Sequence, residues 1–547
     1  MTHKDSSQFW ARWRRQYKTV GWSNKACRPG VSLTIQPASC ISTPVVICRP
    51  TTAVTPEIIM PSDIQTPPRF MEWKEINSLV GSIRTRSLVA RPTTIEQCRE
   101  TLAYCRQHDM TICARGAGRG YGDLALNDGQ ALLDMGAMNR ILGFDEDTAQ
   151  ITVEAGMRII DIYQAVHHRL LMLPASPTES HSSVAGAICA NVNGKDAWRN
   201  GSFAHQVVRL TLLQANGEAL TIDRSHELFN AVVGGIGLLG IIVDATLQLK
   251  PIPSPFVEIN RIPVPDVDAL LATMAQVEQS YDAAVVWVDA YARGLKTGRS
   301  VIHTAKWIES NDTESQRREI LEAGYERLDR HRQFGLALHE KFGPVLSLML
   351  HAQRPMMHLF NRLYYAGCQL LTLTGRSANT ELFLRFGFEA SFTVPPAHLV
   401  CGPRGYTVQL TFPRSSAREA IVELLGICQS SPSPPVTTIL RAHKPDDCLI
   451  SFSEDGYSLN FEFHPKTSNE AASREAVDRL IDATVRRGGK IHLAKDQVLR
   501  PEQFYRVFPR YKDLLAIKRR LDPDGLFTSD LARRVGIDPV LNNQRPE

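Results

Sequence analysis

The sequence predicts an α+β protein with two domains. Three glycine-bearing stretches lie among short strand and helix patterns between about residues 91 and 250. Beyond Pro251, separated strand and helix patterns follow without strict alternation, which favours an antiparallel sheet covered by helices. At ~150 residues per domain, the 547 residues have room for about three or four domain-sized units. With 43% hydrophobic and 22% charged residues, the chain is neither disordered, nor collagen-like, nor a multi-span membrane protein.

Charge and cysteine content exclude further classes. A formal net charge of +5, spread along the chain, gives no reason to expect nucleic acid as a partner. The eleven cysteines are scattered without a Cys-x-x-Cys pair, so we expect no disulfide framework, no metal site and a reducing compartment. No secretory signal is recognisable, and the most apolar segment, Ala231 to Leu247, is too short and too glycine-rich to span a membrane. We therefore expect a cytoplasmic protein and leave peripheral contact with a membrane open.

We divide the chain into four ranges. Residues 1–72 mix Trp, Arg, Ser, Thr and Pro without periodicity, which predicts a weakly ordered N-terminal extension. Residues 73–250 form the first predicted domain, and residues 251–485 form the second. Residues 486–547 make a C-terminal segment.

The first domain is predicted to begin with a helix and three short strands. Thr93 to Glu96 match a capping box, and apolar residues recur at helical spacing from Ile95 to Cys105, so the helix should end near His108. Strands are predicted at 110–114, 131–135 and 149–154, and a second helical stripe at 157–170.

The second domain shows strands at 283–289, 406–412 and 457–463 and helices at 313–331, 415–428 and 473–487. Between them, Phe334 to Gly375 is rich in Leu, Met and Tyr with interspersed basic residues. This block is either an ordinary packed helix or an apolar lip on a lipid surface.

A loop with glycine at every second position carries the first chemical signal. In Arg115-Gly-Ala-Gly-Arg-Gly-Tyr-Gly-Asp123, the glycines allow backbone N–H groups to approach an anion such as a diphosphate closely. The pattern is neither a Rossmann fingerprint nor a Walker loop. A series of tight turns is the alternative interpretation.

Two further stretches strengthen the signal. Ser182 to Lys195 places serines before a small-residue helix start, whose free N–H groups can receive a phosphate. Val232 to Ile242 contains four glycines, which permit a flat ring or another backbone to pack closely. Each stretch alone also has a purely structural explanation.

In this order, the three stretches resemble the FAD-binding domain of the vanillyl-alcohol oxidase and p-cresol methylhydroxylase (PCMH) type of FAD-linked oxidases. Within this family, four motifs resemble the branch of decaprenylphosphoryl-β-D-ribose 2′-oxidases. They are the first glycine loop, Asn193-Gly-Lys195 with Gly201-Ser-Phe203, Ala494-Lys-Asp496, and the tail Asp522-Pro with Ser529-Asp-Leu-Ala-Arg-Arg534. The resemblance runs from about residue 75 to 537 and is loose between 300 and 400. It implies a PCMH-type fold with an antiparallel-sheet substrate domain and a C-terminal segment that returns to the flavin.

The resemblance implies FAD as cofactor, held mostly by backbone donors. The implied contacts are Ala114, Arg115, Gly116, Ala117, Gly118, Arg119, Gly120, Tyr121, Gly122, Asp123, Leu124, Ser183, Val184, Ala185, Gly186, Ala190, Asn191, Val192, Asn193, Ile241 and His492. Covalently flavinylated relatives place a histidine in the first glycine loop, whereas this loop has none, so we expect non-covalent FAD. A fold that has lost FAD is the alternative, and the presence of every glycine-bearing stretch argues against it.

The same resemblance assigns catalysis to Lys495, beside the flavin and the sugar. Oxidation of a secondary alcohol moves a hydride to the flavin while a proton leaves the hydroxyl. Lys495 is then either the base or a cation that stabilises the reduced flavin and the substrate oxygen. The implied substrate residues are Lys195, Gln409, Arg441 and Asn460, of which Arg441 suits a phosphate oxygen. His303 and His443 receive no role.

Two positions depart from the family pattern. The family has His where this chain has Asn193, and Cys where it has Asn460. Asn193 cannot titrate near neutral pH, so any proton transfer by that histidine is absent or moved. Asn460 removes a reactive thiol, so thiol-directed covalent inhibitors of the family should fail here.

The implied function is FAD-dependent oxidation of a sugar secondary hydroxyl to a ketone. The best-supported substrate class is a polyprenylphosphoryl-β-D-ribofuranose in arabinose-donor synthesis for a cell-wall arabinan, with a short-chain reductase as partner. An alditol or aldonolactone oxidase acting on a free sugar and using oxygen is the enzyme alternative. A flavin-binding or membrane-recruitment module without turnover is the non-enzyme alternative, against which Lys495 argues.

Overall fold

The computed structural model describes residues 67–330, 333, 353–388 and 405–537, apart from Val80 and Lys466. Most of the predicted extension 1–72 and the first part of the block 334–375 therefore lie outside the described residues. All the elements below belong to one compact unit, residues 63–547.

The first sheet carries the glycine loop at the end of a strand. It has four strands in the order β1 (Met71–Asn77), β2 (Arg84–Ala90), β4 (Ala131–Asp134) and β3 (Ile112–Arg115). Strands β2, β4 and β3 run parallel, and β1 pairs antiparallel with β2. Helix α2 (Ile95–Gln107) packs beside β4 through Cys98, Leu102 and Cys105, as its spacing predicts.

The cap of α2 corrects the sequence analysis by one residue. Thr94, and not Thr93, is the N-cap, and its side chain accepts a hydrogen bond from the Gln97 N–H. The Gln97 side chain in turn accepts from the Thr93 N–H at 2.7 Å. The two threonines are adjacent, so the sequence pattern alone does not separate the two registers.

A second, five-stranded antiparallel sheet completes this half of the molecule. Its order is β5 (Ile141–Asp145), β6 (Gln150–Glu154), β10 (Ile241–Gln248), β8 (Val207–Leu213) and β9 (Ala219–Asp223). The intervening elements are α3 (Ile159–Val166), β7 (Leu171–Met172), α4 (Val184–Cys189), α5 (Ala197–Asn200), α6 (Phe229–Val232) and β11 (Lys250–Pro251). The apolar segment 231–247 forms the end of α6, a glycine-rich turn and most of the buried strand β10.

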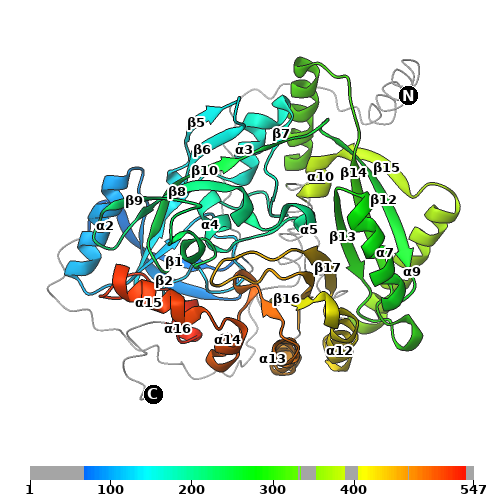
Figure 1. The fold of residues 1–547 in the computed structure, drawn as a ribbon. Helices are drawn as coiled ribbons and strands as arrows, with labels where there is room; N and C mark the ends of the chain where they lie inside the picture. Colours follow the sequence, from blue (N-terminus) through cyan, green and yellow to red (C-terminus); the bar gives the residue numbers. More distant parts are fainter. Residues whose placement is uncertain are drawn as a thin grey trace, which may run out of the picture. The chain divides into compact units, whose positions relative to one another are not determined.

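The second half is built on an eight-stranded sheet in which every pair is antiparallel, which confirms that prediction. Its order is β15 (Ala378–Leu382), β12 (Phe256–Val264), β14 (Ser300–Trp307), β13 (Ala283–Val288), β17 (Thr437–His443), β18 (Gly456–Phe463), β16 (Tyr406–Pro413) and β19 (Lys490–Ile491). Figure 1 shows this sheet beside the two smaller ones.

The two faces of the eight-stranded sheet differ in character. Leu410, Leu440 and Leu459 point to one face, where they join the main apolar core. Helices α12 (Ala417–Ser430) and α13 (Glu470–Arg486) pack against these strands, and α7 (Val267–Ser280) packs against β12 and α12. Because side chains alternate along a strand, the polar residues between them point to the opposite face. Helix α9 (Gln353–Leu373) packs on β12 and β14, and α10 (Phe383–Gly387) follows β15.

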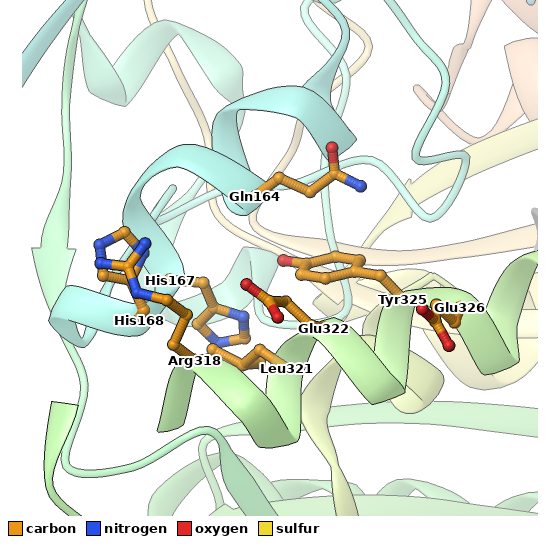
Figure 2. A pocket seen from close by; sticks show the side chains of 8 residues that line it. All are labelled: Gln164, His167, His168, Arg318, Leu321, Glu322, Tyr325 and Glu326. Carbon is orange, nitrogen blue, oxygen red and sulfur yellow. The ribbon is translucent and has the colours of Figure 1, made fainter. Parts of the chain in front are cut away.

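A helix over residues 314–330, close to the predicted range 313–331, packs beside α3 (Figure 2). Between them lies a pocket of about 380 Å³ lined by Gln164, His167, His168, Arg318, Leu321, Glu322, Tyr325 and Glu326 (Figure 2). No sequence-predicted site residue lines it. Among the residues in the described ranges, no helix combines the length and apolarity that crossing a membrane requires.

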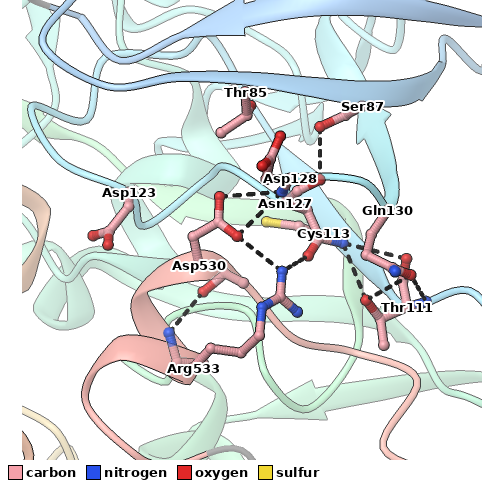
Figure 3. Close-up of polar contacts among 12 residues, drawn as sticks. Thr85, Ser87, Thr111, Cys113, Asp123, Asn127, Asp128, Gln130, Asp530 and Arg533 are labelled. Carbon is pink, nitrogen blue, oxygen red and sulfur yellow. Dashed lines mark hydrogen bonds and ion pairs between the residues drawn. The ribbon is translucent and has the colours of Figure 1, made fainter. Parts of the chain in front are cut away.

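The C-terminal segment returns to the first sheet. After α14 (Pro501–Val507) and α15 (Tyr511–Leu521), the Ile112 N–H donates to the Leu526 carbonyl at 2.7 Å. Helix α16 (Asp530–Arg534) is held there by polar contacts that Figure 3 shows: the Asp128 N–H donates to the Asp530 carboxylate at 3.1 Å, and Arg533 bonds Asn127 and Asp530. In Figure 1 the red helix α16 accordingly lies near the blue strands of the first sheet.

Candidate functional site

The first glycine loop is held by the C-terminal segment. The Tyr121 N–H donates to the Ala494 carbonyl at 2.9 Å, and the Gln497 side chain donates to the Tyr121 carbonyl at 3.2 Å. A Cβ atom at position 122 would lie 1.9 Å from the Asp496 carbonyl oxygen, so this close approach requires Gly122. The loop and the predicted catalytic lysine, Lys495, are therefore adjacent in space.

Ser183 joins the first two glycine-bearing stretches. Its hydroxyl oxygen accepts hydrogen bonds from the Ala117 N–H at 3.2 Å and from the Gly186 N–H at 3.3 Å. Ser183 is also the N-cap of α4, as its position before a small-residue helix start predicts. The loop and the helix start thus form one continuous backbone surface.

This surface fits the diphosphate part of a dinucleotide. A Cβ atom at Gly120 would meet nothing within 4 Å, so one side of the loop is open. Gly186 is exposed although its neighbours Ala185 and Ala187 are buried, so the start of α4 also faces an open space. Gly118 adopts the left-handed φ of +65° that only glycine takes without strain. A phosphate can approach the backbone closely only where side chains are small and the N–H groups are accessible, as they are in the glycine loop and at the start of α4.

Several polar side chains of the predicted cofactor site hold the protein itself. Arg115 donates to the carbonyls of Asn77 at 2.8 Å and Ala125 at 3.0 Å. Asn191 donates to the Asp446 carboxylate at 2.8 Å, and Asp123 forms an ion pair with Arg534 at 2.7 Å. Arg119 lies 3.8 Å from Glu179. At these positions the side chain contacts the protein itself, so we expect the backbone to contact the cofactor.

Most of the remaining predicted cofactor residues lie in or next to the three glycine-bearing stretches. Ala114 is the next-to-last residue of β3, Ala117 lies in the loop and Leu124 directly after it, Val184 and Ala185 form the first turn of α4, Ala190 to Asn193 follow its end, and Ile241 begins β10. His492 lies outside these stretches and follows β19. Ile241 is buried, and His492 stacks on Phe452 at 4.0 Å between ring centroids. Burial lowers the pKa of His492 well below its ordinary value, so this ring is neutral near pH 7.

Gln409, Arg441 and Asn460 lie on three neighbouring strands of the eight-stranded sheet. Gln409 on β16 is directly opposite Asn460 on β18, and Asn460 is directly opposite Ile439 on β17, two residues before Arg441. Directly paired and alternate residues share one face, so all three predicted substrate residues point to the same side. Their positions follow from strand register, which the sequence alone does not reveal.

Lys495 reaches this face from the turn after β19. Its ammonium donates a hydrogen bond to Asn460 Oδ1 at 3.0 Å and lies 5.8 Å from the centre of the Tyr121 ring. Burial, together with the nearby Arg441 cation, lowers the pKa of the Lys495 ammonium to about 7. An amine with such a pKa is a competent proton acceptor at neutral pH.

Glu462 is the site residue that the sequence analysis missed. Burial raises the pKa of its carboxyl group, whereas Lys495 and Arg441 act in the opposite direction, so both cations are near it. The available signal was strand alternation: Glu462 is two residues after Asn460 on β18 and therefore shares its face.

Asn193 contacts a histidine that the sequence analysis left unassigned. Its amide nitrogen is 2.8 Å from His443 Nδ1, and His443 Nε2 is 2.7 Å from the Ser458 hydroxyl. Gln409 donates to the same hydroxyl at 3.0 Å. A buried polar chain thus connects Asn193 to the face that carries Gln409.

Lys195 is the predicted substrate residue whose side chain contacts α10. It is buried, donates to the Phe386 carbonyl at 2.6 Å, and lies 4.2 Å from the centre of the Phe386 ring. Its own carbonyl accepts from the Ala284 N–H at 2.8 Å. Lys195 therefore fixes the start of β13 and α10 to the second glycine-bearing stretch.

Within the described part of the chain, no cluster of His, Cys, Asp and Glu side chains is arranged to hold a metal ion. The seven cysteines that lie there are free thiols.

Comparison with known proteins agrees with this geometry. Residues 87–223 match the family model of an FAD binding domain, and residues 401–535 match the model described as D-arabinono-1,4-lactone oxidase. The first range holds the first two glycine-bearing stretches, and the second holds Gln409, Arg441, Asn460 and Lys495. These matches confirm the predicted FAD-binding domain and FAD as the cofactor.

Several known proteins align with this chain over nearly their full length. The decaprenylphosphoryl-β-D-ribose oxidase of Mycolicibacterium smegmatis is 27% identical, over 86% of this chain and 98% of its own. The L-gulonolactone oxidase of Bos taurus is 25% identical, over 81% and 94%. The L-gulono-1,4-lactone dehydrogenase of Mycobacterium tuberculosis is 24% identical, over 82% and 96%. These relatives confirm the predicted resemblance to FAD-linked oxidases.

Proposed function

We propose that this chain, an FAD-dependent oxidoreductase of the PCMH type acting on CH–OH groups, oxidises the 2′-hydroxyl of a polyprenylphosphoryl-β-D-ribofuranose to a ketone. One observation carries the proposal: Lys495 contacts Asn460 at 3.0 Å on a sheet face that also bears Arg441 and Glu462. This face lies against the glycine loop through Tyr121 and Ala494. The arrangement offers a proton acceptor and an anion-binding cation next to the cofactor segments.

Each residue then has a chemical task. FAD, when bound, accepts the hydride from the carbon that carries the hydroxyl. The neutral amine of Lys495 takes the hydroxyl proton, so the electron pair of the C–H bond and the O–H proton leave the alcohol separately and a C=O bond forms. Asn460 orients the Lys495 amine through its Oδ1.

Arg441 supports a phosphorylated sugar as substrate. Its guanidinium lies 3.3 Å from the Thr178 hydroxyl and close enough to Lys495 to lower the pKa of that group. A guanidinium in a partly buried site can bind a phosphate oxygen and hold the sugar in place. A free aldonolactone, which has no charge, gives this cation no such partner.

An aldonolactone oxidase is the second candidate. The match of residues 401–535 to D-arabinono-1,4-lactone oxidase and the similarity to L-gulonolactone oxidase favour it. The two functions differ in their substrate and in their electron acceptor, so an activity assay can distinguish them directly. Rapid oxygen consumption with a free lactone would favour this candidate over the glycosyl phosphate.

The test is the visible flavin spectrum of the purified protein under anaerobic conditions. Addition of polyprenylphosphoryl ribose should bleach the oxidised-flavin band, whereas free ribose and L-gulonolactone should leave the absorbance of this band unchanged. Lys495→Met should retain the band and lose bleaching. Lys490→Met is the matched control, because Lys490 lies on the same segment but pairs with Glu454. Bleaching by the lactone alone would contradict the proposed substrate.

The ketone product needs a second enzyme to complete epimerisation to arabinose. A short-chain reductase that returns a hydride to the opposite face of the 2′-carbon meets this need, and we propose such an enzyme as the functional partner. Addition of a reductase of this class with its nicotinamide cofactor to the turnover mixture should convert the keto product to the arabinosyl epimer.

A further inference from the structure

Helix α9 is fixed to the eight-stranded sheet by one side. Asn361 donates to the Asp289 carboxylate at 2.8 Å, and the Tyr364 hydroxyl is 2.8 Å from His303 Nε2. Arg299 lies over the Tyr365 ring at 5.0 Å, and Cys368 is buried beneath the helix. These contacts set which side of α9 faces away from the protein.

The outward side of α9 is apolar. Among the described residues, eleven large hydrophobic side chains are exposed, and seven of them lie on this one helix. They are Met356, Leu359, Phe360, Leu363, Leu370, Leu371 and Leu373. The spacing of three to four residues aligns most of them in one stripe along the helix. A concentration of this kind marks an interaction surface.

The charge around this stripe selects the partner. Residues 341–380 contain four basic residues, Lys341, Arg354, Arg362 and Arg376, and no acidic residue. Arg362 and Arg376 are exposed. An apolar stripe on a segment whose charged residues are all basic suits an anionic phospholipid surface. A second copy of the chain would bring identical basic faces together across a two-fold axis, which like-charge repulsion opposes.

The helix lies on the same face of the sheet as the candidate site. Trp287 on β13, which contacts Tyr364 of α9, is directly opposite Ile439 on β17, and Ile439 is directly opposite Asn460 on β18. This row points to one side and crosses two strand spacings, about 10 Å. The helix therefore flanks the face that carries the Lys495 contact (Figure 1).

We propose that the apolar stripe of α9 docks on an anionic phospholipid membrane. The stripe enters the interface between headgroups and acyl chains, and Arg362 and Arg376 contact the headgroups. Docking sets the candidate site beside the membrane that holds a lipid-linked sugar; this last step rests on the proposed function, whereas the docking itself does not.

Vesicle sedimentation of the full chain tests the proposal. The protein should sediment with phosphatidylcholine vesicles that contain phosphatidylglycerol, and less with phosphatidylcholine alone or at high salt. The triple variant L359S/F360S/L363S should weaken binding at least ~10-fold, because three apolar side chains no longer enter the interface. The control I141S/L142S removes two similarly exposed residues on β5 and should bind as the wild type does.

Two outcomes would overturn the docking proposal: no binding by the wild type, or equal binding by the triple variant. A shift of the triple variant from dimer to monomer together with equal vesicle binding would assign the stripe to a contact between two copies of the chain. A soluble short-chain ribosyl phosphate separates docking from catalysis. This soluble substrate should bleach the flavin band of the triple variant as fully as it bleaches that of the wild type. If no ribosyl phosphate bleaches the flavin while vesicle binding follows the expected pattern, docking stands and the proposed substrate is wrong.

Discussion

Asn193 and His443, 250 residues apart in the chain, are joined by a hydrogen bond of 2.8 Å. The family resemblance places a histidine at position 193, and here an imidazole lies directly behind the asparagine. Burial, with a contribution from Arg441, lowers the pKa of His443 to about 3, so the ring is neutral at physiological pH. Nδ1 then accepts from the Asn193 amide and Nε2–H donates to Ser458. The histidine holds the asparagine and does not transfer a proton itself.

His443→Leu should therefore weaken FAD binding. The substitution removes the buried acceptor of the Asn193 amide and one of the two donors to the Ser458 hydroxyl, the other being Gln409. An unsatisfied buried amide costs on the order of 1–3 kcal/mol, which predicts an FAD Kd raised about 10-fold or more. Fluorescence titration of FAD into the apoprotein measures this. His443→Gln should restore most of the affinity, because an amide can bond both neighbours. His226→Leu, in the turn after β9, is the control; equal affinity in all four proteins would refute the positioning role.

The rate of flavin reduction should rise with pH through the titration of Lys495. Because burial and Arg441 lower the pKa of this ammonium to about 7, the neutral base becomes dominant above that pH. Arg441→Met removes a positive neighbour, so the midpoint should move to higher pH; Glu462→Gln removes a negative neighbour, so it should move to lower pH. Stopped-flow reduction at a series of pH values gives the midpoints. A rate that falls as pH rises would assign Lys495 the role of a stabilising cation.

Arg534→Met should loosen the glycine loop. Arg534 pairs with Asp123 of the loop at 2.7 Å and with Asp496, the buried neighbour of Lys495, at 2.9 Å. Its removal leaves two carboxylates without their cation, so we expect an FAD Kd raised about 10-fold and a slower flavin reduction. The neighbouring Arg533 contacts Asn127 and Asp530 instead. Arg533→Met should lower the Tm with a smaller effect on FAD, and the reverse ranking of the two variants would contradict this assignment.

The local sequence pattern predicted helices and strands better than it predicted side-chain contacts. The helix over 95–107, the strands around the glycine loop and the antiparallel sheet follow from periodicity and were confirmed. The cap of the first helix, Thr94, was displaced by one residue. The assignment of individual cofactor and substrate residues and the domain boundaries stay predictions, because they depend on a bound ligand.

The rest of the site depends on contacts between distant segments. Glu462 was missed because its role follows from the register of β18 against β17 and β16, and register is fixed by packing across the sheet. His443 was left unassigned because its partner is 250 residues away. Arg534 was recognised as part of a motif, but the two carboxylates that it joins, Asp123 and Asp496, lie in different parts of the chain.

His167 should make the protein less stable in mild acid. It is fully buried, neither ring nitrogen has a hydrogen-bond partner, and burial lowers its pKa from 6.5 to about 3 (Figure 2). The folded state thus resists protonation that the unfolded chain accepts, so this contribution to stability is present above pH 6.5 and is lost as the pH falls toward 3. Between pH 7.5 and 5.5 the loss is about 1.4 kcal/mol for one such histidine.

His167→Leu, which also removes an unpaired buried polar group, should raise the Tm, and by more at pH 5.5 than at pH 7.5. Leu321→Met in the same pocket is the control, and its Tm difference from the wild type should be the same at both pH values. A His167→Leu variant whose Tm difference does not grow toward low pH would show that the ring is already protonated in the folded protein.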